Sequence, residues 1–160
     1  MRPKLLLWLA VAWLPGMVFA AESCPWLNAA TAGGALGGAV SSVTAKPGKT
    51  GEVANCEFVR KQGSLVVELR IETETLRSPA ADFASYAARC GAGAVILKGI
   101  GNQALACSSG GNEELVELVV SRVRERAFLV RLQTNDRSAA RGELREKARK
   151  VAELVAGFLF

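Results

Sequence analysis

The sequence predicts an α+β fold in which an antiparallel β-sheet of about five to six strands carries about three packed helices. Two stretches indicate this class. Residues 115–134 have the pattern of two strands joined by a tight turn, and residues 139–160 repeat apolar side chains at helical spacing. We therefore expect an amphipathic C-terminal helix that covers one face of the sheet.

The hairpin is the clearest element. Residues 115–123 are rich in valine and leucine, which is typical of a strand near the middle of a sheet. The strand that follows alternates buried and polar positions. A turn at Arg124-Glu125 would place Ser121 opposite Phe128, so the register of the hairpin is also predicted.

Residues 1–20 have the pattern of a secretory signal peptide. Arg2 and Lys4 give a positive start, and an apolar run follows that is well short of the roughly 20 residues needed to span a bilayer. Small residues favour cleavage after Ala20, with Ala21 as the alternative. The remaining residues, 21–160, have the length of a single α+β domain.

A lipid anchor on Cys24 is the alternative to a free mature chain. Small or apolar residues normally precede a lipidated cysteine, and Glu22 does not fit this pattern. We therefore expect a bacterial protein that is exported to the periplasm or secreted, with membrane contact possible but no spanning segment.

Four cysteines follow the signal peptide, and in an exported protein an even number indicates disulfides. Sequential pairing, Cys24 with Cys56 and Cys90 with Cys107, is favoured because it would staple each half of the domain. Zinc sites usually contain closely spaced cysteine pairs or histidines, and this sequence has neither. We expect no metal and no cofactor.

The sequence contains no histidine, which excludes Ser-His-Asp and Cys-His catalysis. Two glycine-rich segments, residues 33–38 and 99–104, lack the partners of a phosphate loop or a dinucleotide fingerprint, so backbone geometry is the expected role. No catalytic residue is therefore assigned, and a non-enzymatic function is predicted. A carboxylate-dependent envelope enzyme is the alternative.

The first half of the domain alternates short elements with turns. Asn28 is expected to cap a short helix that stops at Gly37. Residues 41–51 predict a loop or loose hairpin because they are polar and contain Pro47-Gly48. Strands are expected at residues 53–61 and 64–73, the second with Val67, Leu69 and Ile71 on its buried face.

The middle of the chain begins with a helix at Ser78-Pro79, with serine as the N-cap. We expect Phe83, Ala87 and Cys90 on its buried side. A short strand at residues 94–98, a turn, further extended structure at residues 104–107 and a flexible loop lead to the central hairpin.

The C-terminal helix should bury a stripe of apolar side chains, namely Leu144, Ala148, Val151, Val155 and Phe158. Its outer side offers three i,i+4 ion pairs, Glu143–Lys147, Glu146–Lys150 and Arg149–Glu153. Covering the sheet is the expected role, and contact with a membrane surface or a partner is the alternative.

These features together resemble small exported bacterial domains of unknown function, including the actinobacterial lipoprotein family DUF3558 and lipoprotein relatives with a Mog1/PsbP-like fold. The shared residues are Cys24-Pro25-Trp26-Leu27 before the first helix, Cys56, the segment 99–104 beside Cys107, and the closing hairpin. The resemblance implies an antiparallel sheet with packed helices and no catalytic residues to carry over. Glu22 departs from the lipoprotein pattern.

Positive charge is concentrated near the end of the chain. Residues 122–150 carry a net charge of +6, whereas residues 21–121 carry −2. The candidate partner-binding residues are Arg122, Arg124, Arg126 and Arg131, which could meet an acidic protein, an anionic glycan or lipid head groups. A solvated strand edge is the alternative. Nucleic acid is not expected, because aromatic residues are not interleaved with the arginines.

Overall fold

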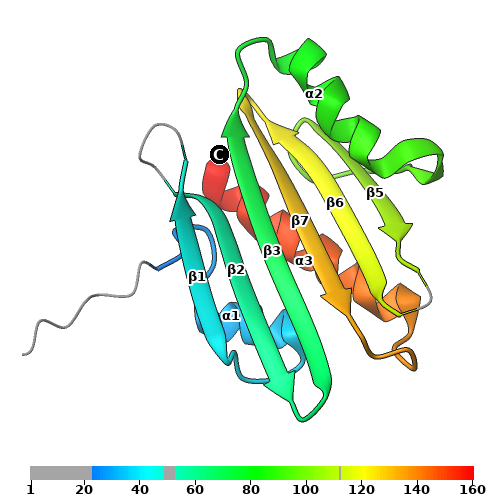
Figure 1. The fold of residues 1–160 in the computed structure, drawn as a ribbon. Helices are drawn as coiled ribbons and strands as arrows, with labels where there is room; N and C mark the ends of the chain where they lie inside the picture. The colour runs from blue at the N-terminus through cyan, green and yellow to red at the C-terminus, as the bar shows by residue number, and fades with distance from the viewer. Residues whose placement is uncertain (1–22, 49–52, 112) are drawn as a thin grey trace, which may run out of the picture.

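The computed structural model describes residues 23–48, 53–111 and 113–160 (Figure 1). The predicted signal peptide and its cleavage site lie outside these residues. The described part of the chain contains one antiparallel sheet of seven strands in the order β1-β2-β3-β7-β6-β5-β4. The strands are β1 (Ser42–Pro47), β2 (Val53–Gln62), β3 (Leu65–Thr75), β4 (Val95–Leu97), β5 (Gln103–Ser109), β6 (Leu115–Val123) and β7 (Arg126–Thr134).

Three α-helices pack on this sheet, α1 (Ala29–Leu36), α2 (Pro79–Ala87) and α3 (Arg141–Leu159), and a 3-10 segment, η1 (Ala88–Gly93), extends α2. The predicted α+β class with an antiparallel sheet is confirmed. The strand count is one higher than expected because β1 occupies part of the segment that we expected to be a loop or a loose hairpin, and β1 pairs with the next strand, β2. Val43 and Ala45 of β1 are half-buried and the other residues are exposed, so its alternation is weaker than that of a half-buried strand.

The β6–β7 hairpin has the predicted register. Ser121 lies opposite Phe128, and Val119 lies opposite Val130. β7 also pairs with β3 along its whole length, which places it at the centre of the sheet.

Helices α1 and α3 lie on one face of the sheet, which we call the α3 face (Figure 1). Its core is built from side chains of β2, β3, β6 and β7. The largest of those that are almost completely buried are Phe58, Phe128, Leu69, Ile71 and Leu132. Each such side chain stabilises the fold by about 2 kcal/mol. Most of the hydrophobic core therefore lies on this face.

The C-terminal helix presents a slightly different face from the one predicted. Leu144, Ala148, Val151 and Val155 are buried as expected, but Phe158 is 59% exposed. Ala152 and Ala156 are buried in its place, because these small side chains let α3 lie close to the sheet on that side and rotate the helix. Two of the three predicted ion pairs form, whereas Glu146 lies 3.9 Å from Arg149 rather than pairing with Lys150.

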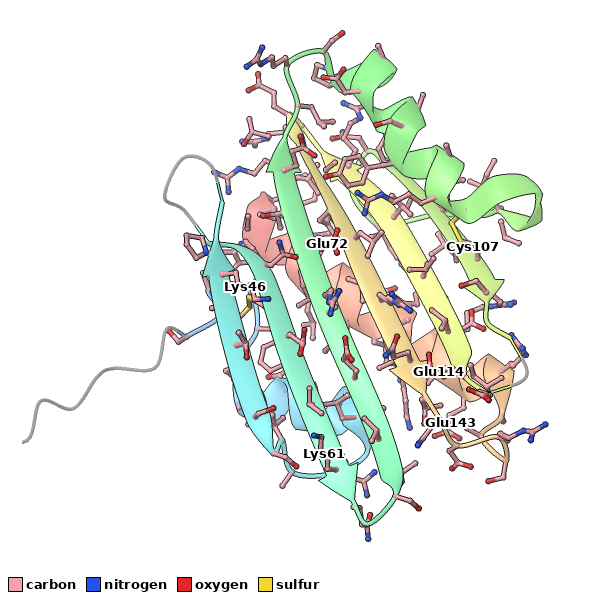
Figure 2. The ribbon with its side chains drawn as sticks, viewed as in Figure 1. Lys46, Lys61, Glu72, Cys107, Glu114 and Glu143 are labelled. Carbon is pink, nitrogen blue, oxygen red and sulfur yellow. A yellow bond between two sulfur atoms is a disulfide. The ribbon has the colours of Figure 1, made fainter. Side chains whose placement is uncertain are left out.

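The opposite face, which we call the α2 face, has two unlike parts. Helix α2 covers the part over β6 and β7, where Phe83 and Tyr86 pack on Val120 and Leu129. The rest, over β1, β2 and β3, has no helix on it and carries charged side chains, among them Lys46 and Glu72 (Figure 2). Only part of this face is therefore closed by an apolar contact.

Helix α2 differs from its prediction in two details. Its buried residues are Phe83 and Tyr86, whereas Ala87 and Cys90 are only partly buried. The Ser78 side chain makes no capping hydrogen bond, and instead the Ser78 N–H donates to Asp82 Oδ2 at 2.8 Å. The helix still begins at Pro79, since proline fits the first helical position.

Two disulfides attach segments outside the sheet to its two opposite faces. Cys24 is bonded to Cys56 on the α3 face, and Cys90 is bonded to Cys107 on the α2 face. This is the sequential pairing that the sequence favours. The bridges attach the N-terminal segment to β2 and the η1 segment to β5.

Candidate functional site

The structure divides the four predicted arginines into two groups. Arg122, Arg124 and Arg126 surround the turn between β6 and β7, and we call them the arginine turn. Arg131 lies farther along β7, opposite Arg70 of β3. Arg131 lies on the same face of the sheet as Arg122, whose partner is Ala127, but it is four residues farther along β7 and is considered separately.

Hydrogen bonds on both sides hold the arginine turn in place. The Arg124 N–H donates to Asn102 Oδ1 at 2.6 Å, and the Asn102 N–H donates to the Arg122 carbonyl at 2.7 Å. On the other side, the Leu76 N–H donates to the Glu125 carbonyl at 2.6 Å. The turn is thus joined to the loop before β5 and to the end of β3.

Gly101 allows the loop before β5 to approach the backbone of Arg122. Its φ is +60°, and a Cβ atom at this position would lie 2.4 Å from the Arg122 carbonyl oxygen. Only glycine allows this close approach of the two backbones without a shift. The glycine-rich segment before β5 therefore has the backbone role that its sequence predicts.

A groove of about 530 Å³ opens beside this corner, between α2 and the β4–β5 pair. We call it the β4–β5 groove. Its apolar walls include Phe83 from α2 and Ile96 and Leu105 from the two strands, and its polar end includes Lys98 and Gln103. Its volume and largely apolar lining are typical of ligand-binding clefts.

Arg122 joins the groove to the arginine turn. Its Nε lies 3.4 Å from Gln103 Oε1 in the groove lining, and its Nη1 donates to the Arg124 carbonyl at 3.0 Å. These contacts orient the guanidinium and leave further N–H donors for a ligand. Groove and turn therefore form one continuous surface, which is the candidate functional site.

The groove side of this site is poor in acidic residues, whereas the end of β3 beside the turn carries Glu72 and Glu74. Residues 83–112 contain no aspartate or glutamate and contain two cations, Arg89 and Lys98. Within the arginine turn itself, Glu125 is the single acid among three arginines. Lys98 and Arg122 therefore give the polar end of the groove a positive charge.

The open part of the α2 face has a different charge balance. Arg70 donates to Glu57 at 2.9 Å and to Glu68 at 3.1 Å, and Gln133 Nε2 donates to Glu68 at 3.1 Å. Arg131 lies at the border of this network, with its Nε buried and without a hydrogen-bond partner among the described residues. Because most charges there are paired, this surface is less suited to a ligand of one sign.

Tyr86 is the titratable group whose pKa is most strongly shifted. Burial raises the pKa of Tyr86, and a 2.6 Å hydrogen bond from its hydroxyl to Glu74 raises the pKa further. Arg89 lies over the ring at 4.7 Å from its centroid and pairs with Glu72 at 2.9 Å. These contacts keep the phenol protonated and attach α2 to β3.

An ion pair between buried Glu117 and half-exposed Arg145 connects α3 to the sheet, and the sequence pattern did not predict it. Glu117 of β6 is 1% exposed and accepts hydrogen bonds from Ser108 at 2.6 Å and from Arg145 at 3.2 Å. The available signal was the alternation of β6, which places this glutamate on the same face as Val119. No cluster of three or more potential metal ligands occurs among the described residues.

Comparison of the chain with protein-family models, with curated proteins and with solved structures gave no match. The resemblance described above stays a prediction. Within the described residues, no helix is long and apolar enough to cross a membrane.

Proposed function

We propose that this protein is an exported, non-enzymatic domain that binds an anionic partner at the cell envelope through the arginine turn and the β4–β5 groove. The observation that carries this proposal is the meeting of Arg122 and Arg124 with an apolar groove at one hydrogen-bonded corner. Two disulfides support a location outside the cytoplasm, because they form and persist in oxidising compartments.

The proposal is tested by reversing charge at the turn. Arg124→Glu combined with Arg126→Glu should abolish capture of envelope proteins that the unaltered protein retains. Capture by the unaltered protein should also weaken as salt is raised, because interactions between exposed charges are screened.

Arg137→Glu combined with Arg141→Glu is the matched control. Both arginines are exposed, lie near the start of α3, and give the same change in net charge. If the turn variant retains the same partners as this control, or if the unaltered protein retains none, the arginine turn is not a binding surface.

A second candidate function is contact with a membrane surface through the end of α3. Leu154, Phe158 and Phe160 are 50%, 59% and 62% exposed there, and Lys150 is exposed one turn earlier. Apolar side chains beside a cation favour the interface of an anionic bilayer. Co-sedimentation with phosphatidylglycerol vesicles should then fall in the variant Leu154→Ser with Phe158→Ser, whereas the arginine-turn variant should retain it.

A further inference from the structure

The β4 edge of the sheet is open. β4 pairs with β5 on one side and is the last strand of the sheet, so alternate peptide groups point away from β5 without a strand partner. Val95 is 57% exposed and Ile96 is 76% exposed. An apolar strand edge of this kind is a template for pairing with another chain.

The opposite edge, β1, has the features that prevent such pairing. β1 ends with Lys46 and Pro47, and its register with β2 shifts between these two residues. Lysine, proline and irregular pairing are devices that block the addition of a further strand. Within β4 none of the three occurs, since the strand consists of Val95, Ile96 and Leu97. The three-residue length of β4 is its one protective feature, so the two edges are not equally protected.

The β4–β5 groove lies directly beside the β4 edge of the sheet. Ile96 belongs both to the edge strand and to the groove lining, and Phe83 lines the same groove from α2. In strand addition, main-chain hydrogen bonds supply affinity and pockets for alternate side chains supply specificity. The edge and the groove together provide both parts of such a site.

The charge around β4 indicates which kind of partner strand fits this edge. Lys98 follows β4 directly and lines the polar end of the groove, and Arg122 is bonded to Gln103 at the same end. A second copy of this chain would bring a further Lys98 toward Lys98 and Arg122, because residues 83–112 carry no acid and Arg89 is already paired with Glu72. An acidic strand avoids this like-charge contact.

We propose that an extended acidic segment of a partner protein adds to the sheet along β4. One apolar side chain of that segment enters the β4–β5 groove between Phe83 and Ile96. Side chains two positions apart lie on the same face of a strand, so an aspartate or glutamate at that spacing reaches Lys98, which follows β4 directly. This inference rests on the proposed function and names its partner class.

The probe is the fluorescein-labelled peptide Ser-Thr-Leu-Thr-Glu-Thr-Glu-Ser, whose leucine and glutamates share one strand face. Fluorescence anisotropy should show saturable binding to the full domain. Peptides with lysine in place of glutamate, or with N-methylated backbone amides, should not bind, because they lose the charge or the main-chain hydrogen bonds. Amide exchange in residues 95–97 should slow when the acidic peptide is bound.

Two variants test the site on the protein. Ile96→Lys and Lys98→Glu should each weaken binding of the acidic peptide at least about tenfold. Leu154→Lys is the matched control, because it adds the same charge at an exposed apolar residue of α3. All three positions are exposed, so the variants should melt like the unaltered protein.

Several results would overturn the inference. These are unchanged peptide affinity in Ile96→Lys, equal binding of the lysine peptide, or unchanged exchange in β4. A dimer in sedimentation velocity that Ile96→Lys dissociates would assign the edge to a second copy, and binding of dodecanoate without the acidic peptide would assign the groove to a small amphiphile. If envelope partners are lost in the arginine-turn variant but kept in Ile96→Lys, the proposed function stands and the strand-addition site does not.

Discussion

The two faces of the sheet are built in different ways. The α3 face is closed by α1 and α3 over a continuous apolar core, and the ion pair between Glu117 and Arg145 joins helix and sheet there. The α2 face has a smaller apolar cluster under α2, a charged open surface and the β4–β5 groove. This difference indicates that stability comes mainly from one face, and that the other is free to carry function.

The largest expected effect tests the core of the α3 face. Phe128→Ala should lower the free energy of unfolding by about 4 kcal/mol, because the fully buried ring would leave a cavity. Lys46→Ala, on the exposed part of the α2 face (Figure 2), should change it by less than about 0.5 kcal/mol. Urea unfolding measures both values, and equal losses would contradict the contrast between the faces.

The disulfides provide the next largest effect, one on each face. Replacing either pair by alanines should cost about 3 kcal/mol, and slightly more for Cys24–Cys56 because its cysteines are separated by 32 residues rather than 17. Only the loss of Cys90–Cys107 should also increase amide exchange in α2. If exchange in α2 is unchanged, that bridge does not hold the wall of the groove.

The ion pair between Glu117 and Arg145 should contribute less to stability than either disulfide. Arg145→Ala leaves Glu117 buried without its charged partner, and we expect a loss of about 2 kcal/mol in thermal or urea unfolding. Arg149→Ala on the same helix removes exposed pairs with Glu146 and Glu153 and should cost less than about 0.5 kcal/mol. A similar cost for both variants would show that burial of Glu117 does not matter.

The smallest effect concerns the loop that leads from β7 to α3. Hydrogen bonds from the Ser138 hydroxyl and N–H hold the pKa of Asp136 below its ordinary value of 3.8. A lowered pKa in the folded state adds stability that is present above pH 4 and is lost as the pH falls through the folded pKa. Urea unfolding between neutral and acid pH should show a smaller decline in Asp136→Asn. If the free energy of unfolding falls equally at acid pH in the variant and the unaltered protein, Asp136 does not contribute to acid unfolding.

The parts of the fold that the sequence predicts are those in which local pattern and tertiary environment agree. The β6–β7 register follows from the period of two and a two-residue turn. Asn28 caps α1 by accepting from the Thr31 N–H at 2.8 Å, and Gly37 ends the helix with a φ of 76°. In such elements the residues that specify the conformation are neighbours along the chain.

The parts that the sequence does not predict depend on contacts between distant residues. β1 is polar and becomes a strand because β2 supplies its hydrogen bonds. The position of Phe158 depends on how closely Ala152 and Ala156 approach the sheet. The groove likewise needs Phe83 from α2 opposite Ile96, and no local pattern relates these two residues.

The Cys24–Cys56 bridge also bears on how the chain could be held at a membrane. A lipidated cysteine carries its diacylglyceryl group on the side-chain sulfur, and in the folded domain that sulfur is bonded to Cys56. The Cys24 sulfur can therefore form either the thioether to the lipid or the disulfide to Cys56, but not both. Any molecule lipidated there would have to leave Cys56 as an unpaired thiol inside the core.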